Sequence, residues 1–319
     1  MRKWLLSVLI FVTAPAPAQD TLHTVTNEIL LANVNKKDSL QYRKWIVGTG
    51  SALLYGGSFI FLNEAWYKGY PRSTFHSFND AAEWKQMDKI GHSWAAYHTS
   101  RVNTALWRWA GVDKELAVWI GSGTSLAYLL GIEYLDGRSA EWGWSWPDVA
   151  ADVFGTSLFA AQELTWKEQR IGIKFSSYKK NYKPQSLHQR ADELFGSSLP
   201  ERILKDYNAQ TYWLTFNLQS LFRTNNLPAW LNIAVGHGAD GMFGGFENVA
   251  YDKDGSVIFD RQDIQRQRQW YLSADIDLAR IKTKSVFLRS VFSILNCIKV
   301  PAPALELSNG KIKAHWLHF

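Results

Sequence analysis

The chain of 319 residues contains a single cysteine, Cys297, and this scarcity excludes two kinds of structure. One thiol cannot build a disulfide framework within the chain, and it cannot supply a cysteine-based zinc site. Charged residues make up only 20% of the chain, although Lys and Arg exceed Asp and Glu by 35 to 29. Apolar types reach 46%. This composition is that of a folded chain with a sizeable core, and it excludes a disordered one.

The familiar catalytic motifs are also missing. The sequence has no H-E-x-x-H, no Gly-rich phosphate-binding loop and no G-x-S-x-G. The mean hydropathy of −0.21 argues against a chain made mostly of transmembrane helices. Aromatic residues, by contrast, are abundant, with 16 Trp, 13 Tyr and 17 Phe. Since Trp and Tyr gather at interfaces and at membrane–water boundaries, the composition allows a membrane-contacting envelope protein.

Residues 1–18 have the pattern of a secretory signal peptide. Arg2 and Lys3 precede an apolar stretch over 4–12, and the small residues 16–18 resemble a cleavage site. The apolar stretch is too short to span a bilayer. No cysteine follows it, so no lipid-modified N-terminus is expected. We therefore expect an exported protein of the periplasm or outer membrane, with membrane lipids or other envelope components as partners and no nucleic acid.

The hydrophobic periodicity predicts an α+β fold. We expect an N-terminal helical bundle that contacts or enters a membrane, followed by a C-terminal antiparallel β-rich module. The expected segments are a signal peptide (1–18), a polar segment (19–43), a helical domain (44–175), a connecting segment (176–205) and a β-rich domain (206–319).

The helical half contains two charge-free runs, 45–63 and 116–132. The first has the length of a bilayer span, and Trp residues flank it. Its glycines and hydroxyl residues equally suit close helix packing, so insertion in a membrane and burial in a bundle both remain open. Further helices are expected over 81–109, 114–135 and 146–170, the last with Ser145 as its N-cap.

Strict alternation of apolar and polar residues marks the C-terminal half. It predicts strands over 212–222 and 270–280, and a hairpin across Asn309-Gly310. We also expect a strand over 229–235, an amphipathic helix over 283–298 and turn or bulge glycines around His237. The terminal Phe319 on an alternating strand resembles the end of an outer-membrane barrel, but the five expected strands are fewer than the eight a barrel needs.

The most informative residues are polar side chains inside the apolar helices. Three predicted helices each carry a pair three or four residues apart, which places both members on one helix face. The pairs are Asp88 with His92, Glu133 with Asp136, and Asp148 with Asp152. Buried carboxylates are costly unless they are paired or coordinate something. We therefore expect the three pairs to meet, with Lys89 and Arg138 as counter-charges.

Two interpretations of this cluster remain open. In the first it is a site, with His92 as general base or metal ligand and Asp88, Glu133, Asp136 and Asp148 as ligands or proton partners. In the second it is a structural network that fixes the helix packing. Residues Lys89, Arg138, Ser145 and Asp152 would belong to that network. The sequence names neither a metal nor a cofactor.

The order of these motifs resembles a known pattern. Asp88-Lys89-x-x-His92 is followed by Glu133-x-x-Asp136-Gly137-Arg138, and then by Ser145, Asp148, Asp152 and Gly155. This order resembles the YfiM-like family of predicted periplasmic lipoproteins and, more distantly, the VanZ-like pattern of membrane helices. Asp152 stands where the VanZ-like pattern usually has Asn, and Asp136 where Gln is common. The resemblance covers residues 40–175 and implies a location and an architecture, not a reaction.

Three functions follow as hypotheses. The first is a non-catalytic envelope protein whose buried Asp/His/Glu cluster organises membrane-associated helices. The second is a hydrolase or transferase that acts on a lipid or cell-wall precursor head group, with His92 as base. The third is an outer-membrane barrel.

Overall fold

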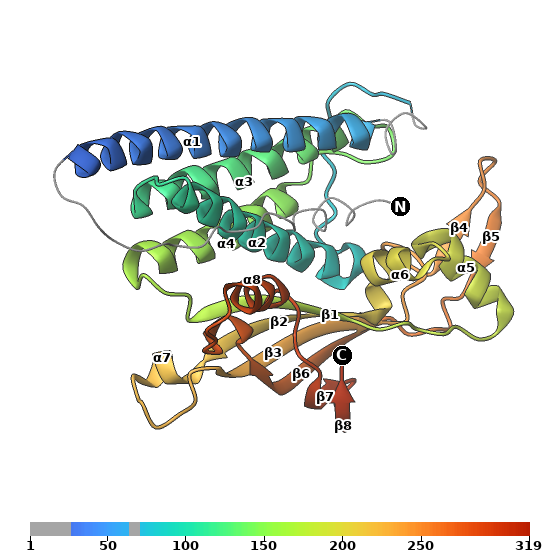
Figure 1. Ribbon diagram of the computed structural model, residues 1–319. Coiled ribbons are helices and arrows are strands. Elements are labelled where there is room, and N and C mark those ends of the chain that lie inside the picture. The colour runs from blue at the N-terminus through green and yellow to red at the C-terminus, as the bar shows by residue number, and fades with distance from the viewer. Residues whose placement is uncertain (1–26, 64–70) are drawn as a thin grey trace.

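The computed structural model describes residues 27–63 and 71–319, with the side chains of 27–38 and 62 left aside. The signal peptide expected over 1–18 and the aromatic flank at Trp66 lie outside the described residues. Within them, helices come first and an antiparallel sheet follows (Figure 1), which confirms the predicted α+β class.

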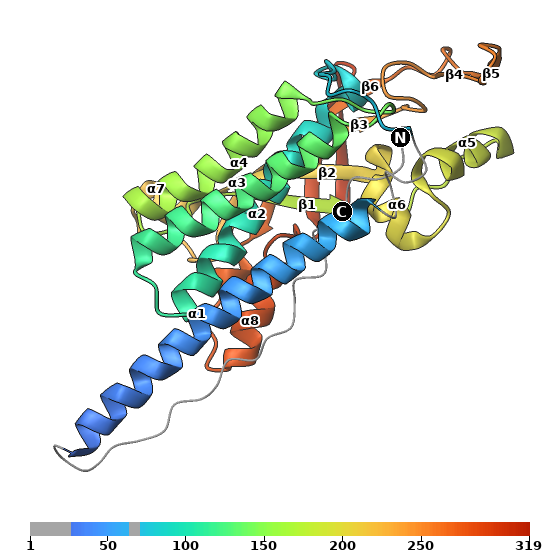
Figure 2. The same ribbon diagram turned by 90° about the horizontal axis from the view of Figure 1, so that it is seen from above.

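Four long helices form a layer above the sheet (Figures 1 and 2). They are α1 (Asn27–Leu62), α2 (Met87–Trp109), α3 (Lys114–Asp136) and α4 (Trp146–Thr165). Side-chain caps explain two of the starts. Asp113 accepts the backbone N–H groups of Glu115 and Leu116 at α3, and Ser145 accepts that of Asp148 at α4, as predicted.

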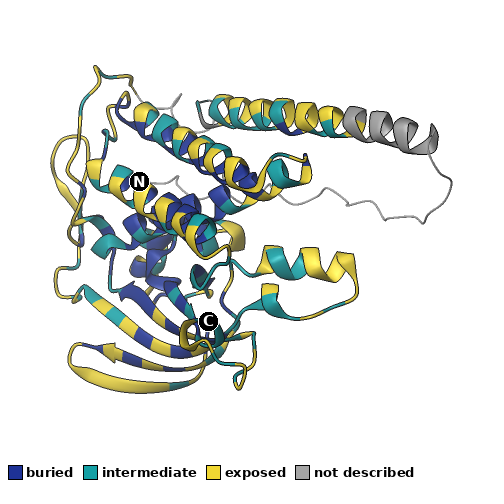
Figure 3. Cartoon of the chain, turned by 90° about the vertical axis from the view of Figure 1, so that its left-hand side faces the viewer, coloured by how far each residue is buried: buried dark blue, intermediate teal, exposed yellow. Residues whose placement is uncertain are grey.

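Helix α2 lies at the centre of this layer and is its most buried member (Figure 3). Two glycines let its neighbours approach closely. A Cβ added at Gly155 of α4 would lie 2.1 Å from the carbonyl oxygen of Ser93, and one at Gly121 of α3 would lie 2.5 Å from the backbone nitrogen of Thr104. Any larger side chain there would push the helices apart, so the close packing of the polar helix faces depends on these glycines.

The main sheet has six strands in the order β1-β2-β3-β6-β7-β8, all antiparallel. Their bounds are β1 Ile171–Ser177, β2 Gln210–Asn217, β3 Leu231–Asp240, β6 Gln267–Ile276, β7 Ala302–Ser308 and β8 Lys311–His318. A separate hairpin consists of β4 (Val249–Tyr251) and β5 (Val257–Asp260). β1 and β8 are the first and last strands of this order. An outer-membrane barrel is a closed sheet of at least eight strands.

Short helices connect the strands. They are α5 (Gln185–Phe195), α6 (Leu199–Lys205), α7 (Leu218–Phe222) and α8 (Val286–Leu295), together with the 3₁₀ turns η3 (Tyr207–Ala209) and η4 (Leu278–Arg280). A further 3₁₀ turn, η2 (Glu83–Gln86), directly precedes α2. The predicted helix over 283–298 and the hairpin at Asn309-Gly310 are both confirmed.

The two faces of the sheet differ. One face carries a buried cluster of Trp213, Ala234, Tyr271 and Ala304. Residues between them, such as Val235 and Leu272, point to the opposite side and are exposed on the middle strands. Figure 3 shows the resulting alternation of buried and exposed bands along the strands.

The helices and the sheet share one core. Trp94 of α2, Tyr212 of β2 and Leu194 of α5 belong to a single buried apolar cluster. The sheet begins at Ile171, inside the segment assigned to the helical domain, and the expected connection over 176–205 contains α5 and α6.

Three strand expectations need correction. The alternation over 212–222 ends as a strand at Asn217, whose side chain caps α7 by accepting the N–H of Ser220. The strand expected over 270–280 ends at Ile276. Gly236 and Gly238, on either side of His237, lie within β3 rather than in a turn, whereas Gly241 lies just after the strand with a positive φ, as a turn glycine does. Gly236 is needed there because a Cβ would lie 2.8 Å from the ring of Trp213.

Among the described residues, α3 alone is long and apolar enough to cross a membrane, and 44% of its most apolar 18-residue segment is buried. A core helix satisfies the same criteria of length and composition. The charge-free run over 45–63 lies in α1, which exposes Trp45 and Leu53 and buries Val47.

Candidate functional site

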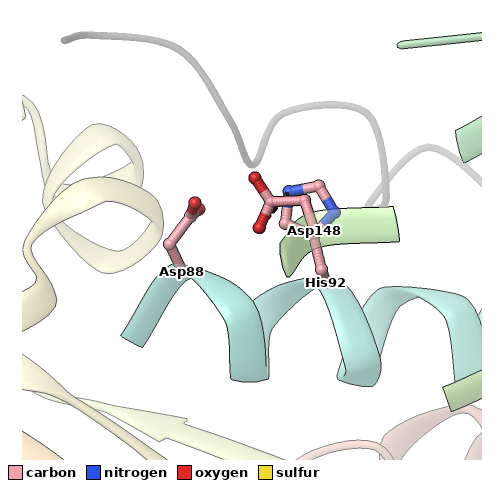
Figure 4. A group of neighbouring side chains, drawn as sticks. All are labelled: Asp88, His92 and Asp148. Carbon is pink, nitrogen blue, oxygen red and sulfur yellow. Dashed lines mark ion pairs between the residues drawn. The ribbon is translucent and has the colours of Figure 1, made fainter. Parts of the chain in front are cut away.

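The cluster is built around the first turns of α2. Asp88 and His92 project from one face of this helix, and Asp148 reaches them from the start of α4 (Figure 4). The four-residue spacing in the sequence predicted this shared face. All three side chains are buried, so their charges must be balanced within the protein.

Lys89 provides the main positive charge. Its Nζ lies 2.5 Å from Oδ2 of Asp80, 2.7 Å from Oδ1 of Asp148 and 3.1 Å from Oδ2 of Asp88. Burial alone would lower the pKa of Lys89, but Asp88 and Asp148 raise it above its usual range. Lys89 is therefore an ammonium ion that joins α2, α4 and the loop before η2.

His92 provides the second positive charge. Its Nδ1 lies 3.1 Å from Oδ1 of Asp152, and its Nε2 lies 3.9 Å from both Oε1 of Glu133 and Oδ1 of Asp148. Burial would lower the pKa of His92, but the carboxylates of Asp148 and Asp152 raise it well above its usual range. Nδ1 is hydrogen-bonded to Oδ1 of Asp152, and the raised pKa favours the protonated ring, which donates this bond.

The carboxyl groups fall into two classes. Burial raises the pKa of Asp88, but Lys89 and His92 outweigh it and hold this pKa below its usual range. Burial raises the pKa of Glu133 to about 9, against the opposing effect of His92, and that of Asp148 to about 7. It also raises the pKa of Asp152. The cluster therefore combines a carboxylate that is held ionised, Asp88, with a carboxyl group that keeps its proton at neutral pH, Glu133.

Three residues that were not identified as site residues from the sequence contribute to the site, namely Asp80, Glu83 and Tyr207. Asp80 accepts a hydrogen bond at Oδ1 from the Ser145 hydroxyl at 2.6 Å, and the Tyr207 hydroxyl donates to Oδ1 of Asp88 at 3.0 Å. Glu83 lines the same pocket as these carboxylates. Asp80 has the signal of a helix N-cap in the sequence, but Tyr207 lies far along the chain and carries no such signal.

The remaining expected members are placed differently. Asp136 is buried and lines the pocket beside Glu133 and Asp148. Arg138 is exposed and lines a separate pocket with Arg72 and Tyr134, so it does not reach the cluster. Lys89 is a counter-charge of the cluster, as expected, but the second positive charge comes from His92 and not from Arg138.

A metal ion fits these residues poorly. Donor atoms of Asp88, His92 and Asp148 lie within 4.8 Å of one another, which is a metal-like grouping. However, Lys89 already contacts both carboxylates. Metal binding to histidine needs the neutral ring, so an ion here would have to displace both Lys89 and the proton that Asp148 and Asp152 favour on His92.

Two other histidines have structural surroundings. His98 is buried, and its Nε2 donates to the carbonyl of Ile173 at 2.7 Å, which ties α2 to β1. Burial lowers the pKa of His98 to about 3. His237 packs on Trp270, and its Nε2 lies 3.2 Å from the carbonyl oxygen of Lys85.

The polar core of the cluster coincides with a segment that is similar to known sequences. Residues 77–163 match the family model described as "Predicted periplasmic lipoprotein (DUF2279)". The matched segment is less than half of the chain and runs from the loop before η2 into α4, so it includes the carboxylates that contact Lys89 and His92. The description is consistent with the exported, periplasmic location expected from the sequence. No curated protein and no solved structure matches the chain.

Proposed function

We propose that the protein is a non-catalytic component of the cell envelope, in which the Lys89–His92 network holds the helical layer together and fixes it to the sheet. The observation that carries this proposal is that both buried cations are already surrounded by carboxylates. Tyr207, just before β2, extends the network by its bond to Asp88. A buried network of ion pairs and hydrogen bonds of this kind favours one arrangement of the packed elements.

The enzymatic alternative requires His92 to accept a proton from a substrate. A general base needs a pKa near the operating pH and an unprotonated nitrogen. The carboxylates of Asp148 and Asp152 hold the proton on His92, so this ring is a poor base. Nothing else in the described residues favours the head-group hydrolase over the structural role.

The location proposed is the periplasm or the outer membrane. The signal pattern in residues 1–18 and the similarity of residues 77–163 to predicted periplasmic lipoproteins support export. The resemblance to the YfiM-like family and to the VanZ-like helix pattern supports the same compartment. We propose that exposed apolar side chains make the membrane contact.

Replacing His92 with glutamine tests the structural role. The new amide could still donate one hydrogen bond to Asp152, but the buried carboxylates would lose a cation. We expect the free energy of unfolding to fall by about 2 kcal/mol. The measurement is chemical denaturation of the purified protein, with His188→Gln as matched control, because the His188–Asp192 pair is exposed. Loss of function in cells at wild-type stability would instead favour the enzyme.

For the membrane partner, α8 offers the best-suited surface. None of its residues is buried, and Phe287 is 73% exposed. The stretch from Leu278 to Leu305 contains no acidic residue, and three of its basic residues, Lys282, Lys284 and Arg289, are exposed beside or on α8. An exposed apolar helix with basic flanks is typical of segments that lie on anionic lipid surfaces.

We expect the protein to bind vesicles that contain phosphatidylglycerol more strongly than vesicles of phosphatidylcholine alone. Phe287→Ser should lower the binding constant about tenfold, because an aromatic side chain no longer enters the lipid. Co-sedimentation measures the bound fraction, and added salt should reduce it. Ile312→Ser, an equally exposed apolar position on β8, is the control. Equal binding of the two variants would contradict a role for α8.

A further inference from the structure

The carboxylates of the cluster line one side of a cavity of about 290 Å³. Residues outside the Lys89–His92 network line much of the rest of it. Seven acidic residues line this cavity, namely Asp80, Glu83, Asp88, Glu133, Asp136, Glu141 and Asp148. The only basic residue among the described lining residues is Lys205, which pairs with Glu201. The cavity therefore favours a cation over an anion.

The acidic side of the cavity is not fully satisfied by the protein. The side chain of Glu133 is only 1% exposed, yet its Oε1 has no hydrogen-bond partner among the described residues, and its closest cation is His92 Nε2 at 3.9 Å. An unpartnered buried carboxyl oxygen in a cavity wall costs free energy. A ligand that donates a hydrogen bond or brings positive charge would satisfy it.

Glu83, which also lines the cavity, is a second source of negative charge. Glu83 makes no ion pair or side-chain hydrogen bond with any described residue, and it packs against Gly245, where a Cβ would lie 2.2 Å from its Oε1. Burial raises the pKa of Glu83 to about 7, with Asp88 adding to the effect. A bound cation would hold Glu83 ionised.

The rest of the lining is aromatic. Phe78, Trp84, Trp142, Phe195, Tyr207 and Phe246 contribute rings to the cavity. The faces of such rings attract an organic cation, and their bodies bury the carbon atoms attached to it. Acidic groups and rings in one cavity suit a cation with an apolar body better than a hydrated metal ion.

We propose that this cavity binds an organic ammonium group, a primary or quaternary amine carried on an apolar or amphiphilic body, with Glu83 and Glu133 facing the nitrogen and Trp142 packing against its substituents. A divalent metal is the weaker candidate, since Lys89 already contacts Asp88 and Asp148. No further group of three metal donors stands around Glu83 in the described part of the chain. The ligand site goes beyond the structural role of the network and does not rest on it.

Titration calorimetry with benzyltrimethylammonium tests the proposal on the full chain. We expect saturable binding, and binding of the neutral benzyl alcohol that is at least about tenfold weaker. Glu83→Gln and Trp142→Leu should each weaken binding of the cation about tenfold. Glu115→Gln, which removes an exposed carboxylate on α3, should leave it unchanged. Denaturation curves of each variant check that it folds as the wild type does.

Two competitors identify the source of the amine. Displacement of the probe by vesicles of phosphatidylethanolamine supports a lipid head group as ligand, and displacement by soluble ethanolamine alone supports a free amine. Equal binding of benzyl alcohol overturns the proposal in favour of an apolar cavity. Zn²⁺ binding that Asp88→Asn abolishes, without binding of the ammonium probe, replaces it with a metal site. Equal binding of benzyl alcohol leaves the network proposal standing, because Glu83 makes no ion pair with Lys89 or His92 among the described residues, whereas a Zn²⁺ site at Asp88 overturns both proposals, because Asp88 pairs with Lys89.

Discussion

Replacing Lys89 with Met is expected to lower the free energy of unfolding by about 3 to 5 kcal/mol, which corresponds to a fall in Tm of about 10 °C. The change removes the ammonium ion that contacts Asp80, Asp88 and Asp148. The methionine fills much of the volume of the lysine stem, so the loss measures charge more than packing. Three buried carboxylates then face one another with only His92 nearby.

The measurement is denaturant unfolding of both proteins over a range of pH. Protonation of the carboxyl groups relieves their repulsion, so the difference between Lys89→Met and the wild type should shrink as the pH falls. The matched control is Lys167→Met, which breaks an exposed pair with Glu115 and should change stability by less than about 0.5 kcal/mol. A Lys89→Met protein as stable as this control would show that the network does not hold the fold together.

The regular parts of the fold and the centre of the cluster follow from local spacing. Four residues separate Asp88 from His92, and the same interval separates Asp148 from Asp152, so each pair shares a helix face whatever the tertiary structure. Ser145 caps α4 for an equally local reason, since Pro and Asp follow it at the start of the helix. These expectations needed no knowledge of distant partners.

Expectations that depended on distant partners were less accurate. The glycines around His237 have the composition of a turn, yet Gly236 and Gly238 lie in β3, and at Gly236 the ring of Trp213 occupies the space of a side chain. Tyr207 reaches Asp88 across 119 positions of sequence. Arg138 is near Asp136 in the sequence, but it is exposed and lines a different pocket together with Arg72. The periodicity of apolar residues in the sequence predicts local helices and strands, but it does not predict which residues distant in the sequence come into contact.

Replacing Glu133 with glutamine is expected to stabilise the protein increasingly as the pH rises. The pKa of Glu133 is raised to about 9 in the folded protein and is near its ordinary value, about 4.3, in the unfolded chain. Between these values the folded state binds more protons than the unfolded state, so the wild type loses stability as the pH rises. The glutamine amide mimics the protonated carboxyl, keeps an oxygen for the N–H of Ser145 and has no such pH dependence.

The two proteins should therefore be equally stable near pH 4, and the advantage of Glu133→Gln should grow by up to about 1.4 kcal/mol per pH unit until about pH 9. Denaturant titrations at intervals across this range measure the difference. Glu193→Gln, at an exposed carboxylate on α5, should show no such trend. Parallel stability curves for Glu133→Gln and the wild type would mean that Glu133 is ionised in the folded protein. In that case a cation must already neutralise it, because a buried carboxylate with an unpartnered oxygen would otherwise keep its proton.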